Sequence, residues 1–274
     1  MGTVTSRDGT AIAFDRRGSG PAVVLVGGAT VDRAENTPLA EELAAGFTVL
    51  NYDRRGRGAS ADTLPYAVER EIEDLAAVIG AAGATAHVFG VSSGGALALE
   101  AAAAGAAIGR LAVYEVPNSV ADDATERHRA YVEGLEALLA AGRRGDAFAH
   151  FMRTVGSPEP TIEYARSSPL WPGLEALAHT LAFDAACLGD GRPPAGRLAR
   201  IAQPTLVLTG GASPHAPVGG AQLDFFDAVA DAIAAAVPTA RREILEGQTH
   251  MVDPKALAPA LTRFFAVDNP SPDT

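Results

Sequence analysis

The chain has 274 residues, 47% of them hydrophobic, and carries a formal net charge of −11 at pH 7. This length and hydrophobic content suit one large folded unit and argue against disorder. The acidic balance argues against a nucleic-acid or anionic-membrane partner, because phosphate groups attract clustered Lys and Arg. Cys187 is the only cysteine, which excludes an internal disulfide and a thiolate zinc site.

The sequence shows no pattern of a membrane span or of a secretory signal; Met1, Gly2 and Ser6 fit a myristoylation pattern, but we favour a first strand at 3–6. No apolar run approaches the 18 or so residues of a membrane span, and the N-terminus lacks the basic and apolar regions of a secretory signal. We therefore expect a cytoplasmic protein with a small-molecule substrate, no membrane partner, no metal and no cofactor. Nothing in the sequence indicates the oligomeric state.

The N-terminal part of the chain alternates predicted strands with predicted helices. Short β-branched and apolar runs, some bounded by turn residues, predict strands at 3–6, 11–16, 22–26, 47–51, 87–89 and 110–114. Helical patterns lie between them at 34–45, 67–82 and 93–104. Strands that alternate with helices require parallel crossovers, so the pattern predicts an α/β fold with a mostly parallel central sheet flanked by helices.

The alternation stops after Pro117. Residues 118–196 show helical patterns interrupted by glycines and prolines, and the alternation resumes with a strand at 204–209, a helix at 221–236, a strand at 241–245 and a helix at 254–265. We therefore predict an α/β core from residues 1–117 and 197–274, with a helical cap inserted at 118–196. Segments inserted at the ends of parallel strands usually cover a site.

The strongest chemical signal is a glycine-flanked serine between a predicted strand and a predicted helix. Residues 90–94 read G-V-S-S-G and match G-x-S-x-G. In such a turn Ser92 takes a strained backbone that exposes its hydroxyl, while Gly90 and Gly94 lack the side chains that would clash. The following helix directs its N-terminal N–H groups toward a developing oxyanion. The alternative is a glycine-rich turn at a phosphate.

Further segments carry a family resemblance that spans nearly the whole chain. Residues 53–60 (D-R-R-G-R-G-A-S) are similar to a D-x-R-G-x-G-x-S loop, residues 204–211 resemble a late strand with its turn, and residues 247–250 (G-Q-T-H) resemble a histidine-bearing segment. Together with the serine turn, they make the chain resemble the α/β-hydrolase fold superfamily, and within it small capped bacterial serine hydrolases. The loop at 53–60 is interpreted as pinning a turn rather than as a catalytic arginine cluster.

The resemblance implies a base and two oxyanion donors. His250 follows the last predicted strand, in the family's order of serine, acid and histidine. Imidazole suits the role because its ordinary pKa of about 6.5 lets it accept and return the serine proton. The oxyanion donors implied are the backbone N–H groups of Ser93 and Ala29, although the family usually has a histidine where this chain has Gly27.

The third triad member departs from the family pattern. Ser213 occupies the usual position of the acid, and serine supplies no negative charge to an imidazolium. We favour Glu115, which ends the strand after the serine's helix, because some lipases of this fold carry the acid there. The alternatives are a weaker triad through Ser213 or no hydrolysis at all; Asp184 and Asp253 are weaker candidates, and Asp253 resembles a helix N-cap.

Apolar residues of the insertion are candidates for the substrate pocket, or else form the insertion's own core. They are Phe148, Phe151, Met152, Trp171 and Phe183, with Gly28 as either a pocket residue or a turn glycine. The predicted function is a serine hydrolase that cleaves a small apolar ester, thioester or lactone through an acyl-enzyme on Ser92. The alternatives are a non-hydrolytic enzyme of this fold (a lyase, a cyclase or a cofactor-free peroxidase-like enzyme) and a catalytically silent ligand-binding protein.

Overall fold

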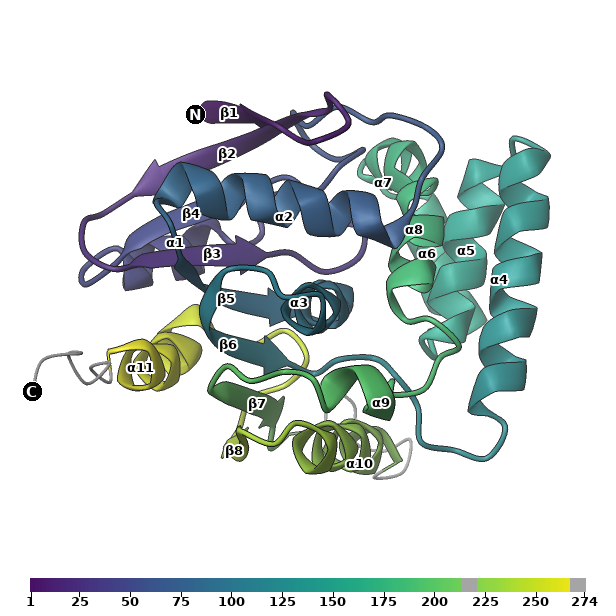
Figure 1. Ribbon diagram of the computed structural model, residues 1–274. Helices are drawn as coiled ribbons and strands as arrows, with labels where there is room; N and C mark the ends of the chain where they lie inside the picture. Colours follow the sequence, from purple (N-terminus) through teal and green to yellow (C-terminus); the bar gives the residue numbers. More distant parts are fainter. Residues whose placement is uncertain (213–220, 267–274) are drawn as a thin grey trace, which may run out of the picture.

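A computed structural model describes residues 1–212 and 221–266 (Figure 1). Its described residues form an eight-stranded sheet in the order β1-β2-β4-β3-β5-β6-β7-β8, antiparallel at β1, β2 and β4 and parallel from β4 through β3 to β8. The strands are β1 (Gly2–Thr5), β2 (Ala11–Arg17), β3 (Ala22–Val26), β4 (Thr48–Tyr52), β5 (Ala86–Val91), β6 (Ile108–Tyr114), β7 (Thr205–Gly210) and β8 (Ala240–Leu245). The predicted α/β-hydrolase architecture, a mostly parallel sheet flanked by helices, is confirmed.

Helices cover both faces of the sheet, and a run of helices lies between β6 and β7. The helices are α1 (Thr37–Leu43), α2 (Val68–Ala82), α3 (Ser93–Ala103), α4 (Ala124–Ala140), α5 (Arg144–Thr154), α6 (Glu159–Arg166), α7 (Trp171–Leu177), α8 (Thr180–Cys187), α9 (Ala195–Leu198), α10 (Ala221–Ala236) and α11 (Pro254–Phe265). No helix among the described residues is both long and apolar enough to cross a membrane.

One predicted helix is shorter than its pattern suggested. The sequence predicts a helix at 34–45, whereas α1 covers only Thr37–Leu43. The carboxylate of Asp32 accepts a hydrogen bond from the Ala34 N–H at 2.7 Å, which holds the preceding residues in a turn. Pro38 stands in the first turn of α1, where its missing N–H costs nothing, so the helix begins there.

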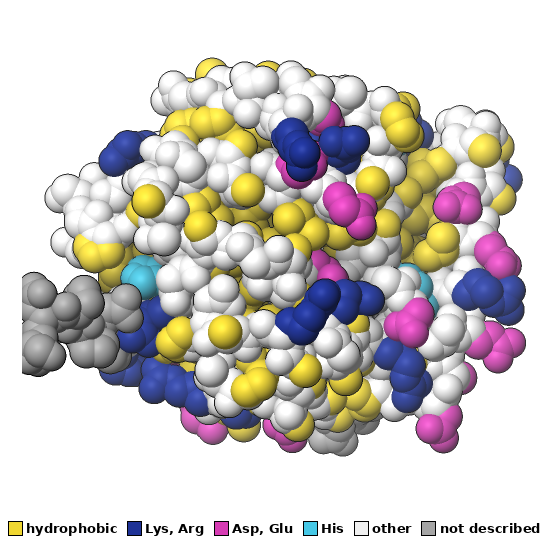
Figure 2. All heavy atoms as spheres, in the orientation of Figure 1, with side chains coloured by type: hydrophobic (Ala, Val, Ile, Leu, Met, Phe, Trp, Pro, Cys, Tyr) yellow, Lys and Arg dark blue, Asp and Glu magenta, His cyan; other side chains and the backbone are white. Residues whose placement is uncertain are grey.

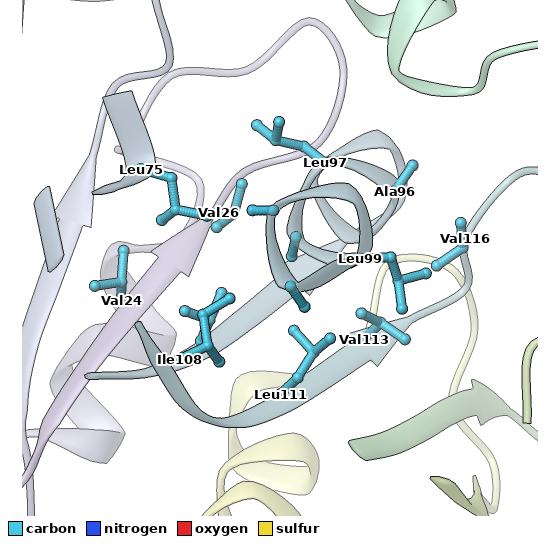
Figure 3. Close-up of a cluster of buried hydrophobic side chains, with 14 of the residues drawn as sticks. Val24, Val26, Leu75, Ala96, Leu97, Leu99, Ile108, Leu111, Val113 and Val116 are labelled. Carbon is cyan, nitrogen blue, oxygen red and sulfur yellow. The ribbon is translucent and has the colours of Figure 1, made fainter. Parts of the chain in front are cut away.

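The core forms two apolar layers, one on each face of the sheet. Alternate residues of β3 belong to different layers: Val24 and Val26 lie in the layer that includes α2, α3 and α10, whereas Val23 and Leu25 lie in the layer that includes α1 and α11. In the first layer Leu99 of α3 lies beside Val113 and Val116 (Figure 3). Burying one such side chain contributes about 1.5–3 kcal/mol, so this packing holds α3 firmly on the sheet.

The inserted helices have a third apolar cluster of their own. It is built on Leu135, Phe148, Trp171 and Leu181, and Ala29 of the core packs against it. In Figure 1 the arrowheads of β3, β5 and β6 point toward this insertion, and α8 contacts α2 and α3. On the face drawn in Figure 2, acidic and basic side chains are interspersed over the molecule. The carboxyl ends of the central strands therefore face the inserted helices.

Candidate active site

Ser92 stands in a strained turn at the junction of β5 and α3. Its φ of 55° and ψ of −127° lie in a region that residues with a side chain rarely adopt. A Cβ on Gly90 would lie 2.5 Å from the carbonyl oxygen of Gly94, and a Cβ on Gly94 would lie 2.4 Å from that of Gly27. The two glycines of the motif are thus required by close backbone approach. Such strain costs on the order of 1–3 kcal/mol and is common at functional sites.

His250 and Glu115 contact each other, although 135 residues separate them. Glu115 follows β6, and His250 lies in the loop between β8 and α11. The imidazole Nδ1–H donates to Oε2 of Glu115 at 2.7 Å, and the N–H of Gly210 donates to Oε1 at 2.9 Å. The Glu115 side chain is 4% exposed and that of His250 is 33% exposed. A buried carboxylate therefore holds Nδ1 of the imidazole, and Nε2 makes no hydrogen bond within the described residues.

Tyr114 connects the serine turn to the histidine loop. Its carbonyl oxygen accepts a hydrogen bond from the N–H of Ser92 at 2.9 Å, and its hydroxyl donates to the carbonyl of Thr249 at 2.5 Å. Burial raises the pKa of the Tyr114 phenol, so the hydroxyl remains a donor. Within the described residues, the Ser92 hydroxyl makes no hydrogen bond to His250. Catalytic hydrogen bonds are often long without substrate and shorten when it binds.

Phe226 covers one face of the histidine ring. The two rings are stacked, with centroids 5.1 Å apart and planes 8° apart. Phe226 belongs to α10, and sequence reasoning missed both it and Tyr114. The only signals were an aromatic pair in an alanine-rich helix and a tyrosine at the end of a buried strand. These contacts fix the imidazole plane.

The loop after β3 lies against the serine. A Cβ on Gly28 would lie 3.2 Å from Cβ of Ser92 and 3.8 Å from its hydroxyl oxygen, so a side chain at this position would crowd the serine. The Ala29 N–H donates to no protein acceptor within the described residues. Ser93 is the first residue of α3, where a backbone N–H lacks an intrahelical partner. Within the described residues, two N–H groups without a protein acceptor thus belong to the residue after Ser92 and to the residue after Gly28.

The arginines of the 53–60 loop are buried and paired. Arg54 donates to both oxygens of Glu71 at 2.7 and 2.8 Å, and Arg55 donates to both oxygens of Asp74 at 2.7 Å. Each of the two guanidinium groups is 0–1% exposed. They hold the loop in place instead of being open to substrate.

The other acid candidates lie elsewhere. Asp184 receives hydrogen bonds from Arg54, Arg57 and Ser93, and its carboxyl pKa is lowered: burial acts to raise it, but the two arginines outweigh burial. Asp253 accepts from the N–H of Lys255 at 2.9 Å and caps α11. Ser213 lies outside the described residues.

The residues predicted to line the pocket lie in two different environments. Phe148 and Trp171 are buried edge-to-face in the insertion's own cluster, with centroids 5.4 Å apart, and Phe151 and Met152 are partly buried beside it. Phe183 stacks on Tyr66 with centroids 4.0 Å apart. Because Ala29 packs against the same cluster, the insertion's apolar side chains reach the loop beside Ser92.

Comparisons with known proteins support the fold. The model of the alpha/beta hydrolase family matches residues 23–260. The crystal structure of an alpha/beta hydrolase from Sphaerobacter thermophilus DSM 20745 is 52% identical, with a TM-score of 0.85, over 97% of this chain and 100% of that one. A thermophilic esterase from Thermogutta terrifontis is 24% identical, with a TM-score of 0.67, over 96% of this chain and 97% of that one.

Among curated proteins, the uncharacterized hydrolase YraK of Bacillus subtilis (strain 168) is 36% identical over 96 residues. That match covers 34% of this chain and 35% of YraK, so the chain spans about a third of the length of this relative. The chain belongs to the alpha/beta hydrolase family.

Proposed function

We propose that the protein is a serine hydrolase that cleaves a small apolar ester, thioester or lactone through an acyl-enzyme on Ser92. The observation that carries the proposal is the 2.7 Å hydrogen bond between His250 Nδ1 and Glu115. The serine at position 213 removes the family's usual acid, and that departure was the reason to consider a non-hydrolytic enzyme. A buried carboxylate on the histidine supports hydrolysis over that alternative.

The proposed reaction follows the geometry of the site. Since Glu115 occupies Nδ1, the Nε2 atom of His250 takes the proton as Ser92 Oγ attacks the carbonyl carbon. The carbonyl oxygen gains the negative charge and receives hydrogen bonds from the N–H groups of Ala29 and Ser93. His250 returns the proton to the leaving alcohol, thiol or lactone oxygen, which leaves an ester on Ser92. Water then attacks that ester by the same route, and Ser92 is restored.

The surroundings favour a small apolar acyl group. The inserted cluster that Ala29 touches is built from hydrocarbon and aromatic side chains. The three arginines of the neighbouring loop are each 0–1% exposed, and they are paired with Glu71, Asp74 and Asp184. They therefore offer no free charge to a substrate carboxylate.

A fluorophosphonate probe tests the proposal. It should phosphonylate Ser92, and Ser92→Ala should lose both labelling and turnover of short-chain p-nitrophenyl esters. Ser167→Ala, which removes an exposed serine hydroxyl from the insertion, is the control and should keep both. Ester turnover that persists in Ser92→Ala would contradict the nucleophile assignment. Unlabelled wild-type protein that converts another substrate class would favour the non-hydrolytic alternative.

A further inference from the structure

We propose that Asp184 and Arg57 are positioning residues for the oxyanion hole, and that the inserted helix α8 thereby sets the two donor N–H groups. This inference rests on the proposed function. It concerns a buried network that joins the insertion to both sides of Ser92.

The network meets at one carboxylate oxygen. Oδ1 of Asp184 accepts hydrogen bonds from Arg54 Nη1 and Arg57 Nη2, each at 2.8 Å, and from the hydroxyl of Ser93 at 2.7 Å. Asp184 belongs to α8 and is 5% exposed. Its carboxylate thus holds the side chain of the residue whose backbone N–H is one of the two proposed donors.

The arginines act on the other proposed donor, the Ala29 N–H, through the carbonyl groups that precede it. Arg57 Nη1 donates to the carbonyl of Gly28 at 2.7 Å, and Arg54 Nη1 donates to the carbonyl of Gly27 at 3.3 Å. The Gly28 carbonyl and the Ala29 N–H belong to the same planar, trans peptide unit, so their directions are coupled. A hydrogen bond that fixes the carbonyl also aims the N–H. It polarises the peptide as well, which strengthens the N–H as a donor.

The network orients the two donor N–H groups without adding net charge beside the oxyanion. Two arginines (Arg54 and Arg57) are balanced by two carboxylates (Glu71 and Asp184). A lone buried carboxylate this close to Ser93 would oppose the developing negative charge. Pairing with the arginines removes that opposition and leaves the directional hydrogen bonds.

The part of the network formed by Asp184 and Arg57 is also poorly built for stability alone. Oδ2 of Asp184 and Nε of Arg57 are buried without a hydrogen-bond partner in the described part of the chain. Buried polar atoms without partners are costly, which makes this a weak stabilising device. The neighbouring pair of Arg55 and Asp74 has the two-bond geometry of a stabilising pair and, within the described residues, makes no hydrogen bond to Ser93 or to the 27–29 loop. It serves as a matched control.

The experiment compares conservative changes in the two networks. Asp184→Asn and Arg57→Lys alter the proposed positioning residues, and Asp74→Asn and Arg55→Lys alter the control pair. Each variant is assayed for kcat and KM on a short-chain p-nitrophenyl ester. Each is also assayed for inhibition by a trifluoromethyl ketone, whose serine adduct carries an oxyanion. The melting temperature of each variant is recorded.

We expect Asp184→Asn and Arg57→Lys to lower kcat about 10- to 100-fold and to weaken ketone inhibition by a similar factor, because a displaced catalytic group costs up to about 100-fold. The KM should change less than about twofold, since ground-state binding does not use the oxyanion donors. The control variants should lower the melting temperature while retaining kcat and ketone inhibition. Ser93→Ala, which removes only the hydroxyl, should show a smaller loss of the same kind and covers the case in which a charge variant fails to fold.

Two results would overturn the inference. The first is equal kinetic losses in the two networks. The second is a loss confined to KM with unchanged ketone inhibition. Failure of the proposed function is distinguishable, because fluorophosphonate would then leave the wild-type Ser92 unlabelled, and the positioning role would fall with it.

Discussion

A carboxylate oxygen of Glu115 lies 2.7 Å from Nδ1 of His250, and the other oxygen accepts the N–H of Gly210 at 2.9 Å. The side chain therefore joins the end of β6 to the end of β7 and to the histidine loop. Glu115 itself has a φ of 45°, unusual for a residue with a side chain. The backbone at this position is held in a strained form that aims the carboxylate at the ring.

Replacing Glu115 tests the proposed acid. Glu115→Gln keeps the size but places an amide against Nδ1, so the imidazolium loses its stabilising charge and its fixed tautomer. We expect kcat for ester hydrolysis to fall on the order of 10³- to 10⁴-fold. Asp253→Asn is the control: its carboxylate is close to His250 in sequence but caps α11, so kcat should be retained. A Glu115→Gln enzyme with near wild-type kcat would remove this residue from the mechanism.

Tyr114→Phe tests the link between the serine turn and the histidine loop. Removing the hydroxyl leaves the Thr249 carbonyl without this donor, so we expect about 1 kcal/mol less stability and a roughly tenfold lower kcat. Tyr52→Phe is the matched control, because the Tyr52 hydroxyl is buried without a partner in the described residues and its loss should be neutral or stabilising. Urea unfolding and steady-state kinetics of both variants make the comparison. Equal behaviour of the two variants would contradict the linking role.

Phe226→Ala tests whether ring stacking orients His250. Loss of the stacked ring frees the imidazole plane, and we expect kcat to fall about tenfold. Phe225→Ala removes the adjacent ring of the same helix, which packs against the core cluster, so it should reduce stability with a smaller effect on kcat. If Phe225→Ala lowers kcat as much as Phe226→Ala, the effect belongs to α10 and not to the ring contact.

His87 predicts a pH dependence of stability. Burial lowers its pKa to about 4, with a further contribution from Arg110, while the unfolded chain keeps a pKa near 6.5. Between these values the unfolded state binds a proton that the folded state does not, so the free energy of unfolding falls as pH falls from about 6.5 toward 4. Urea unfolding of wild type and His87→Gln across this range measures the effect. The variant should show a shallower decline, and an identical decline would exclude His87 as its source.

Local sequence patterns predicted the parts of the fold that depend on neighbouring residues. The apolar run at β3 and the G-x-S-x-G turn each need only adjacent residues, and both stand where the pattern placed them. The prediction of a helix at 34–45 was wrong at its start, because the boundary is set by a proline and by the hydrogen bond that the Asp32 carboxylate accepts from the Ala34 N–H. Hydrophobic periodicity predicts neither feature.

Contacts between distant residues were harder to predict. Glu115 was predicted because Ser213 stands at the usual position of the acid and because some lipases of this fold carry the acid at the strand end that Glu115 follows. The stacking of Phe226 and the convergence of Arg57 and Ser93 on Asp184 depend on how the insertion and α10 pack. Hydrophobic periodicity in the sequence does not predict how these elements pack.

Trapping the covalent intermediate tests the central claim most directly. The enzyme is mixed with excess p-nitrophenyl ester, quenched with acid within the first turnovers, digested and analysed by peptide mass spectrometry. We predict an acyl group on the peptide that contains Ser92, located at that residue by fragmentation and absent from Ser92→Ala. Rapid ester turnover with the acyl group on another residue would contradict the account. So would the absence of an acyl group on Ser92 under conditions in which release of the acyl group is rate-limiting.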